Sequence, residues 1–188
     1  MKKEKANTRK RIAREIELPG NVSATMDGQC LLIKGPKGEV SRTLNQQSVK
    51  IKLDNKKILL ESGRDTKRDK KLVGSLAAHI KNMIKGSLQT HIYTLKICSG
   101  HFPMNVSVSG NKLIIKNFFG EKVPRMLQLK DGANVKVEGE LIHVAATSKE
   151  IAGQVSADIE QLTRRPGYDT RIFQDGCYII SKDGKELK

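Results

Sequence analysis

Residues 102–123 read FPMNVSVSGNKLIIKNFFGEKV, and they repeat a pattern already written at residues 18–40, LPGNVSATMDGQCLLIKGPKGEV. Both stretches run from an apolar residue and a proline through Asn-Val-Ser to a turn. An apolar run ending in lysine follows, and then a Gly-Glu pair. Pro19 therefore aligns with Pro103. A repeated sequence pattern of this length indicates that the chain contains the same structural unit twice.

The repeat continues further along the chain. Residues 71–84 (KLVGSLAAHIKNMI) align with residues 150–162 (EIAGQVSADIEQL), which places Gly74 on Gly153. Each copy covers roughly 80 residues, and two copies are too few for a solenoid, which needs about three or more. The sequence therefore predicts two tandem modules that arose by duplication.

Each copy begins with apolar residues at every second position, which is typical of strands with one buried face. Turn-forming pairs such as Asp27-Gly28 separate the runs, and such short spacing favours antiparallel hairpins. In the first copy the alternating residues are Val22, Ala24, Met26, Leu31, Ile33, Val40, Val49, Ile51, Leu53, Ile58 and Leu60.

The apolar spacing then changes to that of a helix. Residues 72–84 carry one apolar stripe, which Gly86 is expected to end. The second copy has the matching stripe at 151–162, with Thr147 or Ser148 as its N-terminal cap. Strands followed by one helix predict an α+β fold of two tandem duplicated modules, each an antiparallel sheet packed against one helix.

Four segments follow from this reading. Residues 1–14 are a basic flexible N-terminal arm, with seven bases against one acid. Residues 15–90 and 91–165 are the first and second α+β modules, joined by the short strand-like stretch HIYTLKIC at 91–98. Residues 166–188 are a C-terminal basic stretch with a short strand.

The charge of the chain points to a polyanionic partner. Its 188 residues include 35 Lys and Arg against 20 Asp and Glu, a formal net charge of +15. Nucleic acid is the first expectation and an anionic membrane surface the second. No apolar run approaches the roughly 20 residues of a membrane span, and the basic start lacks the apolar core of a secretory signal.

Residues for catalysis or metal binding do not form any recognisable pattern. The four histidines have no metal-ligand spacing, and no serine stands in a nucleophile motif. The three cysteines lie far apart, so buried free thiols in a reducing compartment are expected. The sequence predicts no enzyme, no metal, no cofactor and no small-molecule substrate.

The segment IKGPKGEV at residues 33–40 has the glycines and lysines of a phosphate loop but not their order, and a strand follows it instead of a helix. Two readings stay open. The segment is either an ordinary basic hairpin turn or a turn whose Lys34 and Lys37 touch nucleic-acid phosphates.

Aromatic residues are scarce, with four Phe, three Tyr and no Trp. Phe102, Phe118 and Phe119 are expected to pack in or beside strands. No aromatic run suited to stacking single-stranded bases is present, so RNA recognition through shape and phosphates is predicted.

Several segments together resemble a known family. They are IKGPKGEV, HIKNMIKG, HFPMNV, NFFGEK and, most specifically, RIFQDGCYI near the C-terminus. The chain resembles, over about residues 15–182, the universal large-subunit ribosomal protein six family, called protein nine in eukaryotes. The archaeal and eukaryotic branch carries the pattern formed here by Gln161, Arg171, Phe173, Asp175, Gly176, Tyr178 and Lys182.

The chain departs from that branch at a few positions. Arg165 stands where an apolar residue is expected, Tyr168 where a basic one is usual, and Cys177 where a larger aliphatic is expected. Gly63-Arg64 takes the place of a tryptophan pair often found before the first helix.

The resemblance implies a non-catalytic structural protein of the large ribosomal subunit. It would bind rRNA near the sarcin–ricin loop and the stalk base, beside other ribosomal proteins and close to where translational GTPases dock. The second module and C-terminal stretch would make most RNA contacts. The location would be cytoplasmic, with nucleolar assembly in a eukaryote. The predicted rRNA-binding residues are Lys34, Lys37, Lys116, Lys122, Arg125, Arg164, Arg165, Arg171 and Lys182.

Three rival functions remain open from the sequence. The first is a free-standing RNA-binding or ribosome-assembly factor that uses the same module. The second is an RNA-processing enzyme, and the third is a peripheral membrane protein that uses the basic arm.

Overall fold

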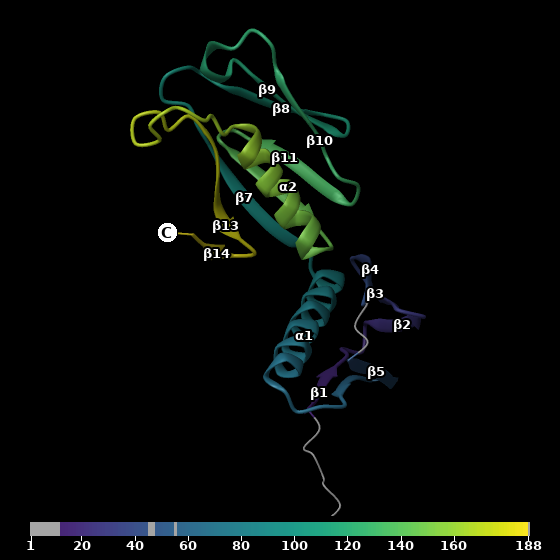
Figure 1. The fold of residues 1–188 in the computed structure, drawn as a ribbon. Coiled ribbons are helices and arrows are strands. Elements are labelled where there is room, and N and C mark those ends of the chain that lie inside the picture. Colours follow the sequence, from purple (N-terminus) through teal and green to yellow (C-terminus); the bar gives the residue numbers. More distant parts are fainter. Residues whose placement is uncertain (1–11, 45–47, 55, 188) are drawn as a thin grey trace, which may run out of the picture. The chain divides into compact units, whose positions relative to one another are not determined.

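The computed structural model of the protein describes residues 12–44, 48–54 and 56–187, and it divides into two compact units, Met1–Leu88 and Gln89–Lys188. Each unit contains antiparallel sheets and one long helix (Figure 1). Most of the predicted arm, residues 1–11, lies outside the described residues. Residues 12–14, which the sequence analysis assigned to the arm, begin the first strand, β1 (Ile12–Glu17).

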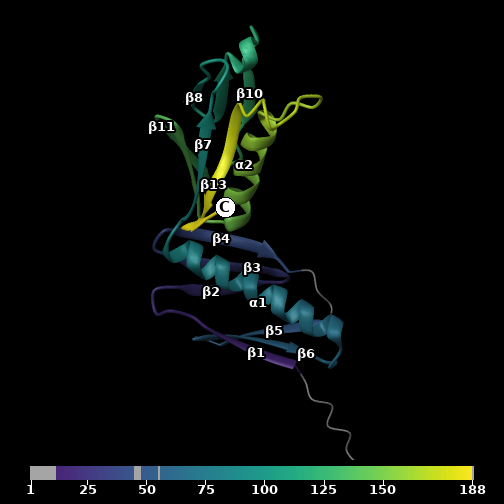
Figure 2. The same cartoon turned by 90° about the vertical axis from the view of Figure 1, so that its left-hand side faces the viewer.

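The first unit contains two three-stranded antiparallel sheets. Strand order is β1-β6-β5 in one sheet and β2-β3-β4 in the other. Figure 2 shows α1 (Lys67–Leu88) lying along the strands of both. The strands are β2 (Ser23–Asp27), β3 (Cys30–Gly35), β4 (Gly38–Thr43), β5 (Val49–Asp54) and β6 (Lys57–Ser62).

The core of the first unit follows from the alternation of apolar residues. Every second residue of β3 and β6 points toward α1, so Leu31, Ile33, Ile58 and Leu60 are completely buried. They meet the apolar stripe of α1, in which Ile80 is also completely buried. Burial of side chains of this size contributes about 1.5–3 kcal/mol each and is the main force that joins helix and sheets.

The end of α1 differs from the prediction. Gly86 does not stop the helix, which continues to Leu88, and Gly86 itself is buried. The hairpin turn between β3 and β4 packs here, because the backbone N–H of Lys37 donates a hydrogen bond of 2.9 Å to the carbonyl oxygen of Ser87. A Cβ atom at Gly35 would lie 2.6 Å from that oxygen, so only glycine fits.

The second unit has the same plan with an addition. Its main sheet has the order β11-β12-β7-β13-β14, its smaller sheet the order β10-β9-β8, and α2 (Lys149–Leu162) packs against both. The strands are β7 (His91–Cys98), β8 (Asn105–Ser109), β9 (Lys112–Lys116), β10 (Arg125–Gln128), β11 (Ala133–Glu138), β12 (Leu141–Ala146), β13 (Gly176–Lys182) and β14 (Lys185–Glu186). A short 3₁₀ turn, η1 (Phe118–Gly120), follows β9.

The topology confirms the α+β class and is consistent with duplication. The pairing β7-β12-β11 repeats β1-β6-β5, and β8-β9-β10 repeats β2-β3-β4. Leu113 and Ile115 are completely buried, as are their counterparts Leu31 and Ile33. The sequence predicted one sheet in each module, whereas each has two. The stretch at residues 91–98 is strand β7, the middle of the five-stranded sheet and the counterpart of β1.

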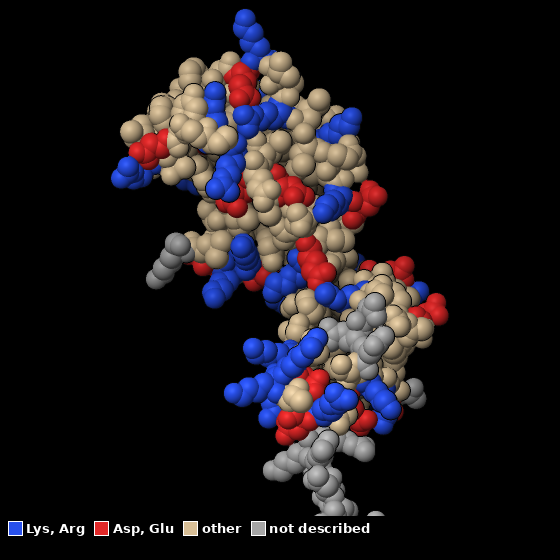
Figure 3. Space-filling model, viewed as in Figure 1, with Lys and Arg blue, Asp and Glu red and all other residues tan. Residues whose placement is uncertain are grey.

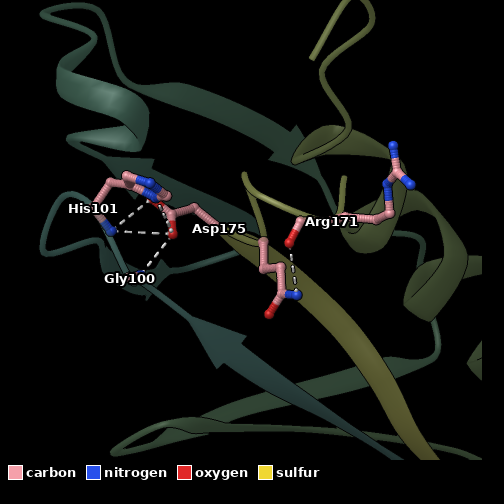
Figure 4. A network of polar contacts seen from close by, with 5 residues as sticks. Gly100, His101, Arg171 and Asp175 are labelled. Carbon is pink, nitrogen blue, oxygen red and sulfur yellow. Dashed lines mark hydrogen bonds and ion pairs between the residues drawn. The ribbon is translucent and has the colours of Figure 1, made fainter. Parts of the chain in front are cut away.

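The C-terminal strand β13 pairs with β7 on the side that β12 leaves open. The carboxylate of Asp175, just before β13, holds the chain there (Figure 4). It accepts a hydrogen bond of 2.6 Å from the backbone N–H of Gly100 and one of 3.1 Å from that of His101. Burial by itself would raise the pKa of Asp175, but these bonds, together with the hydrogen bond and charge of the His101 side chain, outweigh burial and lower the pKa below its usual value.

The structure also tests the expectations for the cap of α2 and for the three cysteines. Ser148 precedes α2 but makes no side-chain capping hydrogen bond. All three cysteines are free; Cys177 is buried, whereas Cys30 and Cys98 are half-buried. Burial raises the pKa of the Cys177 thiol to about 12, so it is unreactive at neutral pH. Within the part of the chain that is described, no helix has the length and apolarity to cross a membrane.

The first prediction concerns Gly35, the last residue of β3, which packs against the end of α1. Gly35→Ala places a methyl group against the Ser87 carbonyl and should lower the free energy of unfolding by about 1–3 kcal/mol, the usual cost of overpacking. Urea unfolding followed by far-UV circular dichroism measures this. Gly63→Ala is the matched control, since no atom lies within 4 Å of that position. Equal stability of the two variants would contradict the close approach.

The second prediction concerns Asp175. At neutral pH, Asp175→Asn should lower the free energy of unfolding by about 1–3 kcal/mol, because two backbone donors lose their charged acceptor. The pKa of Asp175 is lower in the folded than in the unfolded chain, so this stabilisation is present above the ordinary value of 3.8. It disappears as the pH falls through the folded pKa.

The stability difference between wild type and Asp175→Asn should therefore narrow below about pH 4. Tyrosine fluorescence during urea unfolding is a suitable signal, because all three tyrosines (Tyr93, Tyr168 and Tyr178) lie in the second unit. Asp131→Asn, at an exposed carboxylate, serves as the control. A pH-independent difference would show that the charge of Asp175 is not the cause.

Candidate nucleic-acid interface

Figure 3 shows lysine and arginine side chains on the surface of each unit, with fewer acidic side chains among them. Several exposed lysines form ion pairs with neighbouring acids, for example Lys52 with Glu61 at 3.0 Å and Lys57 with Glu15 at 3.3 Å. Exposed pairs of this kind contribute little to stability, about 0–1 kcal/mol each.

The two predicted lysines of the first unit lie at the hairpin that contacts the end of α1. Lys34 is the second-last residue of β3, and its Nζ lies 3.0 Å from a carboxylate oxygen of Glu39, with both side chains more than half exposed. Lys37 lies in the turn with its side chain exposed, while its backbone fastens the turn to Ser87. The hairpin is therefore a structural turn whose lysine side chains remain accessible, so the two readings of IKGPKGEV are compatible.

Lys116 and Lys122 flank the η1 turn of the second unit. Lys116 is the last residue of β9, Lys122 follows η1, and both side chains are exposed. The turn is fixed by a hydrogen bond of 3.0 Å from the Asn117 side-chain amide to the carbonyl oxygen of Pro103. The two lysines thus present their charges from a turn that is held in place.

Arg125, also predicted to bind RNA, makes several contacts within the protein. It donates two hydrogen bonds, of 2.8 and 2.7 Å, to the carboxylate of Glu121 and one of 2.6 Å to the carbonyl oxygen of Leu162. Its guanidinium also lies 4.3 Å from the centre of the Phe118 ring. The hydrogen bonds from Arg125 hold the pKa of Glu121 below its usual value. Arg125 therefore fastens the residues after η1 to the end of α2.

The remaining predicted arginines follow α2. Arg164 is exposed and Arg165 half-buried. Arg171 is exposed and donates to the carboxylate of Asp169, at 3.2 Å from Nε and 2.9 Å from the terminal nitrogen. Figure 4 shows its side chain directed away from the Asp175 carboxylate. Lys182 is separate, since it lies opposite Tyr93 at the other end of β13 from Gly176.

The structure brings together aromatic rings that the sequence analysis did not connect. Phe119 from η1, His101 from the loop after β7, and Tyr168 and Phe173 from the segment after α2 form one cluster. Their ring centres lie 5.0 Å apart for His101 and Phe173, 5.8 Å for Phe119 and Tyr168, and 5.0 Å for Tyr168 and Phe173. The expectation that Phe119 packs beside strands is correct, but Phe102 is 44% exposed.

A cation completes this cluster. The guanidinium carbon of Arg165 lies 4.5 Å from the centre of the Tyr168 ring and 5.2 Å from that of Phe119. Arg165 and Tyr168 are two of the positions at which the chain departs from the family pattern that the sequence suggested. The rings lie far apart along the chain, so no local pattern revealed the cluster. The sequence signal for it was the family segments HFPMNV, NFFGEK and RIFQDGCYI, which carry three of its rings.

The backbone around Phe119 is unusual. Asn117 and Phe119 have φ angles of 59° and 49°, in the left-handed region that residues other than glycine seldom occupy. Such a conformation costs on the order of 1–3 kcal/mol and is concentrated at functional sites. It turns the Phe119 ring toward Tyr168 and Phe173.

Beside the cluster lies a pocket of about 520 Å³, within the size range of ligand pockets. Its lining combines four aromatic residues and two arginines with the acidic residues Glu160 and Asp175 and several polar residues. Among the lining residues are Phe119, Thr163, Arg165, Tyr168, Phe173 and Tyr178. The described residues contain no group of three or more His, Cys, Asp and Glu side chains that could hold a metal ion.

Comparison with known proteins supports the reading of the fold. The sequence matches the family described as "Ribosomal protein L6" over residues 18–89 and 102–176. Three archaeal relatives are each named "Large ribosomal subunit protein uL6". That of Methanococcus vannielii is 46% identical over 176 residues, 94% of this chain and 97% of the relative.

The protein of Haloquadratum walsbyi is 42% identical over 171 residues, which is 89% of this chain and 94% of the relative. That of Methanothrix thermoacetophila is 40% identical over 171 residues, 91% of this chain and 97% of the relative. The two matched ranges fall one in each unit apart from Gln89, as expected if both copies derive from one ancestral module. On its sequence and its duplicated fold, the chain belongs to the ribosomal protein L6 family.

Proposed function

We propose that the protein is a structural constituent of the large ribosomal subunit, where it binds rRNA through many separate phosphate and shape contacts and catalyses no reaction. Membership of a ribosomal protein family carries this proposal. The formal net charge of +15 and the exposed lysines on fixed turns, such as Lys37, Lys116 and Lys122, support it. Lysines displace condensed counterions from RNA, while the buried cores fix where those charges lie.

The proposal includes a location. As in the family that the sequence resembles, the protein would lie near the sarcin–ricin loop and the stalk base, with translational GTPases docking close by. Its partners there are large-subunit rRNA and neighbouring ribosomal proteins, in the cytoplasm. In a eukaryotic source, assembly would begin in the nucleolus. Crosslinking of the chain on intact ribosomes tests this, and crosslinks confined to distant rRNA would contradict it.

Within the second unit, two surfaces are proposed to contact RNA. One is the η1 turn with Lys116 and Lys122, and the other is the segment after α2 with Arg164, Arg165 and Arg171. Lys182, at the far end of β13, would make a separate contact, as would Lys34 and Lys37 in the first unit. Arg125 is proposed to act mainly by holding the two surfaces in register.

A free-standing RNA-binding or assembly factor with the same fold is the remaining alternative. Washing large subunits with high salt separates the two possibilities, because an integral protein stays with the particle. Recovery of the chain entirely in the wash would favour the alternative.

The third prediction concerns salt dependence. If about 6–10 phosphates are contacted, the affinity for a large-subunit rRNA fragment should fall by about 10³–10⁵ between roughly 50 and 200 mM salt. Filter binding or fluorescence anisotropy of labelled RNA measures this. A flat titration would contradict the proposed phosphate contacts.

The fourth prediction separates two roles among the predicted residues. Lys116→Ala and Lys122→Ala should each reduce the slope of log affinity against log salt by about 0.7–0.9 and leave stability unchanged, because each removes one exposed charge. Arg125→Ala should instead lower the free energy of unfolding by about 1–3 kcal/mol, because the half-buried Glu121 and the Leu162 carbonyl lose their partner.

Lys57→Ala, on the exposed face of the first unit, is the control for the lysine variants. Unfolding is followed by tyrosine fluorescence and RNA binding by anisotropy. An Arg125 variant that keeps full stability and loses only RNA affinity would show that this arginine contacts RNA directly.

A further inference from the structure

We propose that the pocket after α2 receives one unpaired RNA base, which stacks on Phe119, Tyr168 and Phe173, the three rings of the aromatic cluster that line the pocket. This inference rests on the proposed RNA-binding function and adds a mode of recognition to it. The sequence analysis predicted recognition through shape and phosphates without stacking. The structure provides a stacking surface that the sequence did not reveal.

The chemistry of the lining favours a base over a phosphate. Glu160 lines the pocket, and its carboxylate would weaken the binding of a phosphate placed inside it. Rings and an arginine plane instead offer flat surfaces for a nucleobase, which stacks on aromatic side chains and on guanidinium groups alike. The carboxylate of Glu160 can also accept a hydrogen bond from an exocyclic amino group of a base.

The charges around the pocket favour RNA as the source of that base. Arg164 and Arg165 line it, and the exposed Arg171 belongs to the same segment. A base inside the pocket would carry its flanking phosphates to these side chains. Tyr168 is 41% exposed and Tyr178 40% exposed, so the pocket is open to solvent and a base can enter without unfolding the unit.

The stacking surface is also held in place. The left-handed conformation at Phe119 turns its ring into the cluster, and Arg125 ties the segment after η1 to the end of α2. On the opposite side, Asp175 fixes the segment that carries Phe173. Rings that are already arranged lose little conformational freedom when a base binds, which favours affinity.

The fifth prediction tests the pocket with three short RNA hairpins: one with a bulged adenosine, one with an abasic residue at the bulge, and one fully paired. The full-length chain should bind the bulged adenosine roughly 5- to 150-fold more tightly than the abasic bulge, as expected for one base–aromatic stack. When 2-aminopurine replaces the bulged base, its fluorescence should decrease on binding, because stacking on the rings quenches it. Equal affinity for all three hairpins would overturn the proposal.

Variants locate the effect. Tyr168→Ala should remove the preference for the bulged base and leave the affinity for the abasic hairpin unchanged, whereas Tyr168→Phe should retain the preference. Phe102→Ala is the matched control, because this exposed ring does not line the pocket. Circular dichroism confirms that each variant is folded. A preference that survives both Tyr168→Ala and Arg165→Ala would place the base elsewhere and refute the assignment.

The outcomes separate this proposal from the function on which it rests. Salt-dependent binding with no preference for the bulged base would refute the base pocket, and a side chain of a neighbouring protein would then be the better occupant. The proposed rRNA binding would stand in that case. Failure to bind any hairpin or the rRNA fragment at low salt would refute both.

Discussion

The second unit depends on the pairing of β13 with β7. This pairing places the chain end beside the strand that opens the unit, and the buried carboxylate of Asp175 fixes it by accepting hydrogen bonds from the Gly100 and His101 backbone. Without it, Phe173 and Tyr178 would have no fixed relation to Phe119. Because an ionised carboxylate under backbone donors is a strong acceptor, a single side chain positions a whole loop.

Arg125 plays the complementary role on the other side of the pocket. Its hydrogen bonds to Glu121 and to the Leu162 carbonyl join the η1 turn to the end of α2, and its guanidinium covers Phe118. In this member of the ribosomal protein L6 family, Arg125 therefore makes hydrogen bonds within the protein, whereas the side chains of exposed lysines such as Lys122 remain accessible to a partner. Net charge alone does not distinguish these two uses.

The duplicated α+β plan could be predicted from the sequence, because alternating apolar residues report directly on strands with one buried face, as at Leu31, Ile33 and their counterparts Leu113 and Ile115. The division of each module into two sheets could not, since pairing partners such as β1 and β6 lie far apart in the chain. The end of α1 was missed because Gly86 is buried within the helix. Each candidate RNA-binding residue could be picked out of the sequence as an individual lysine or arginine. The aromatic cluster could not, because residues 101, 119, 168 and 173 lie far apart in the chain and no local pattern relates them.

The two units also differ in the stage of synthesis at which all their strands are available for folding. All described strands of the first unit precede α1, so its sheets and helix are contained in one continuous stretch that ends at Leu88. The sheet of the second unit begins at His91 yet receives β13 only near the end of the chain. During synthesis, the first unit can therefore fold while translation continues, whereas the sheet of the second unit stays incomplete until β13 has been translated.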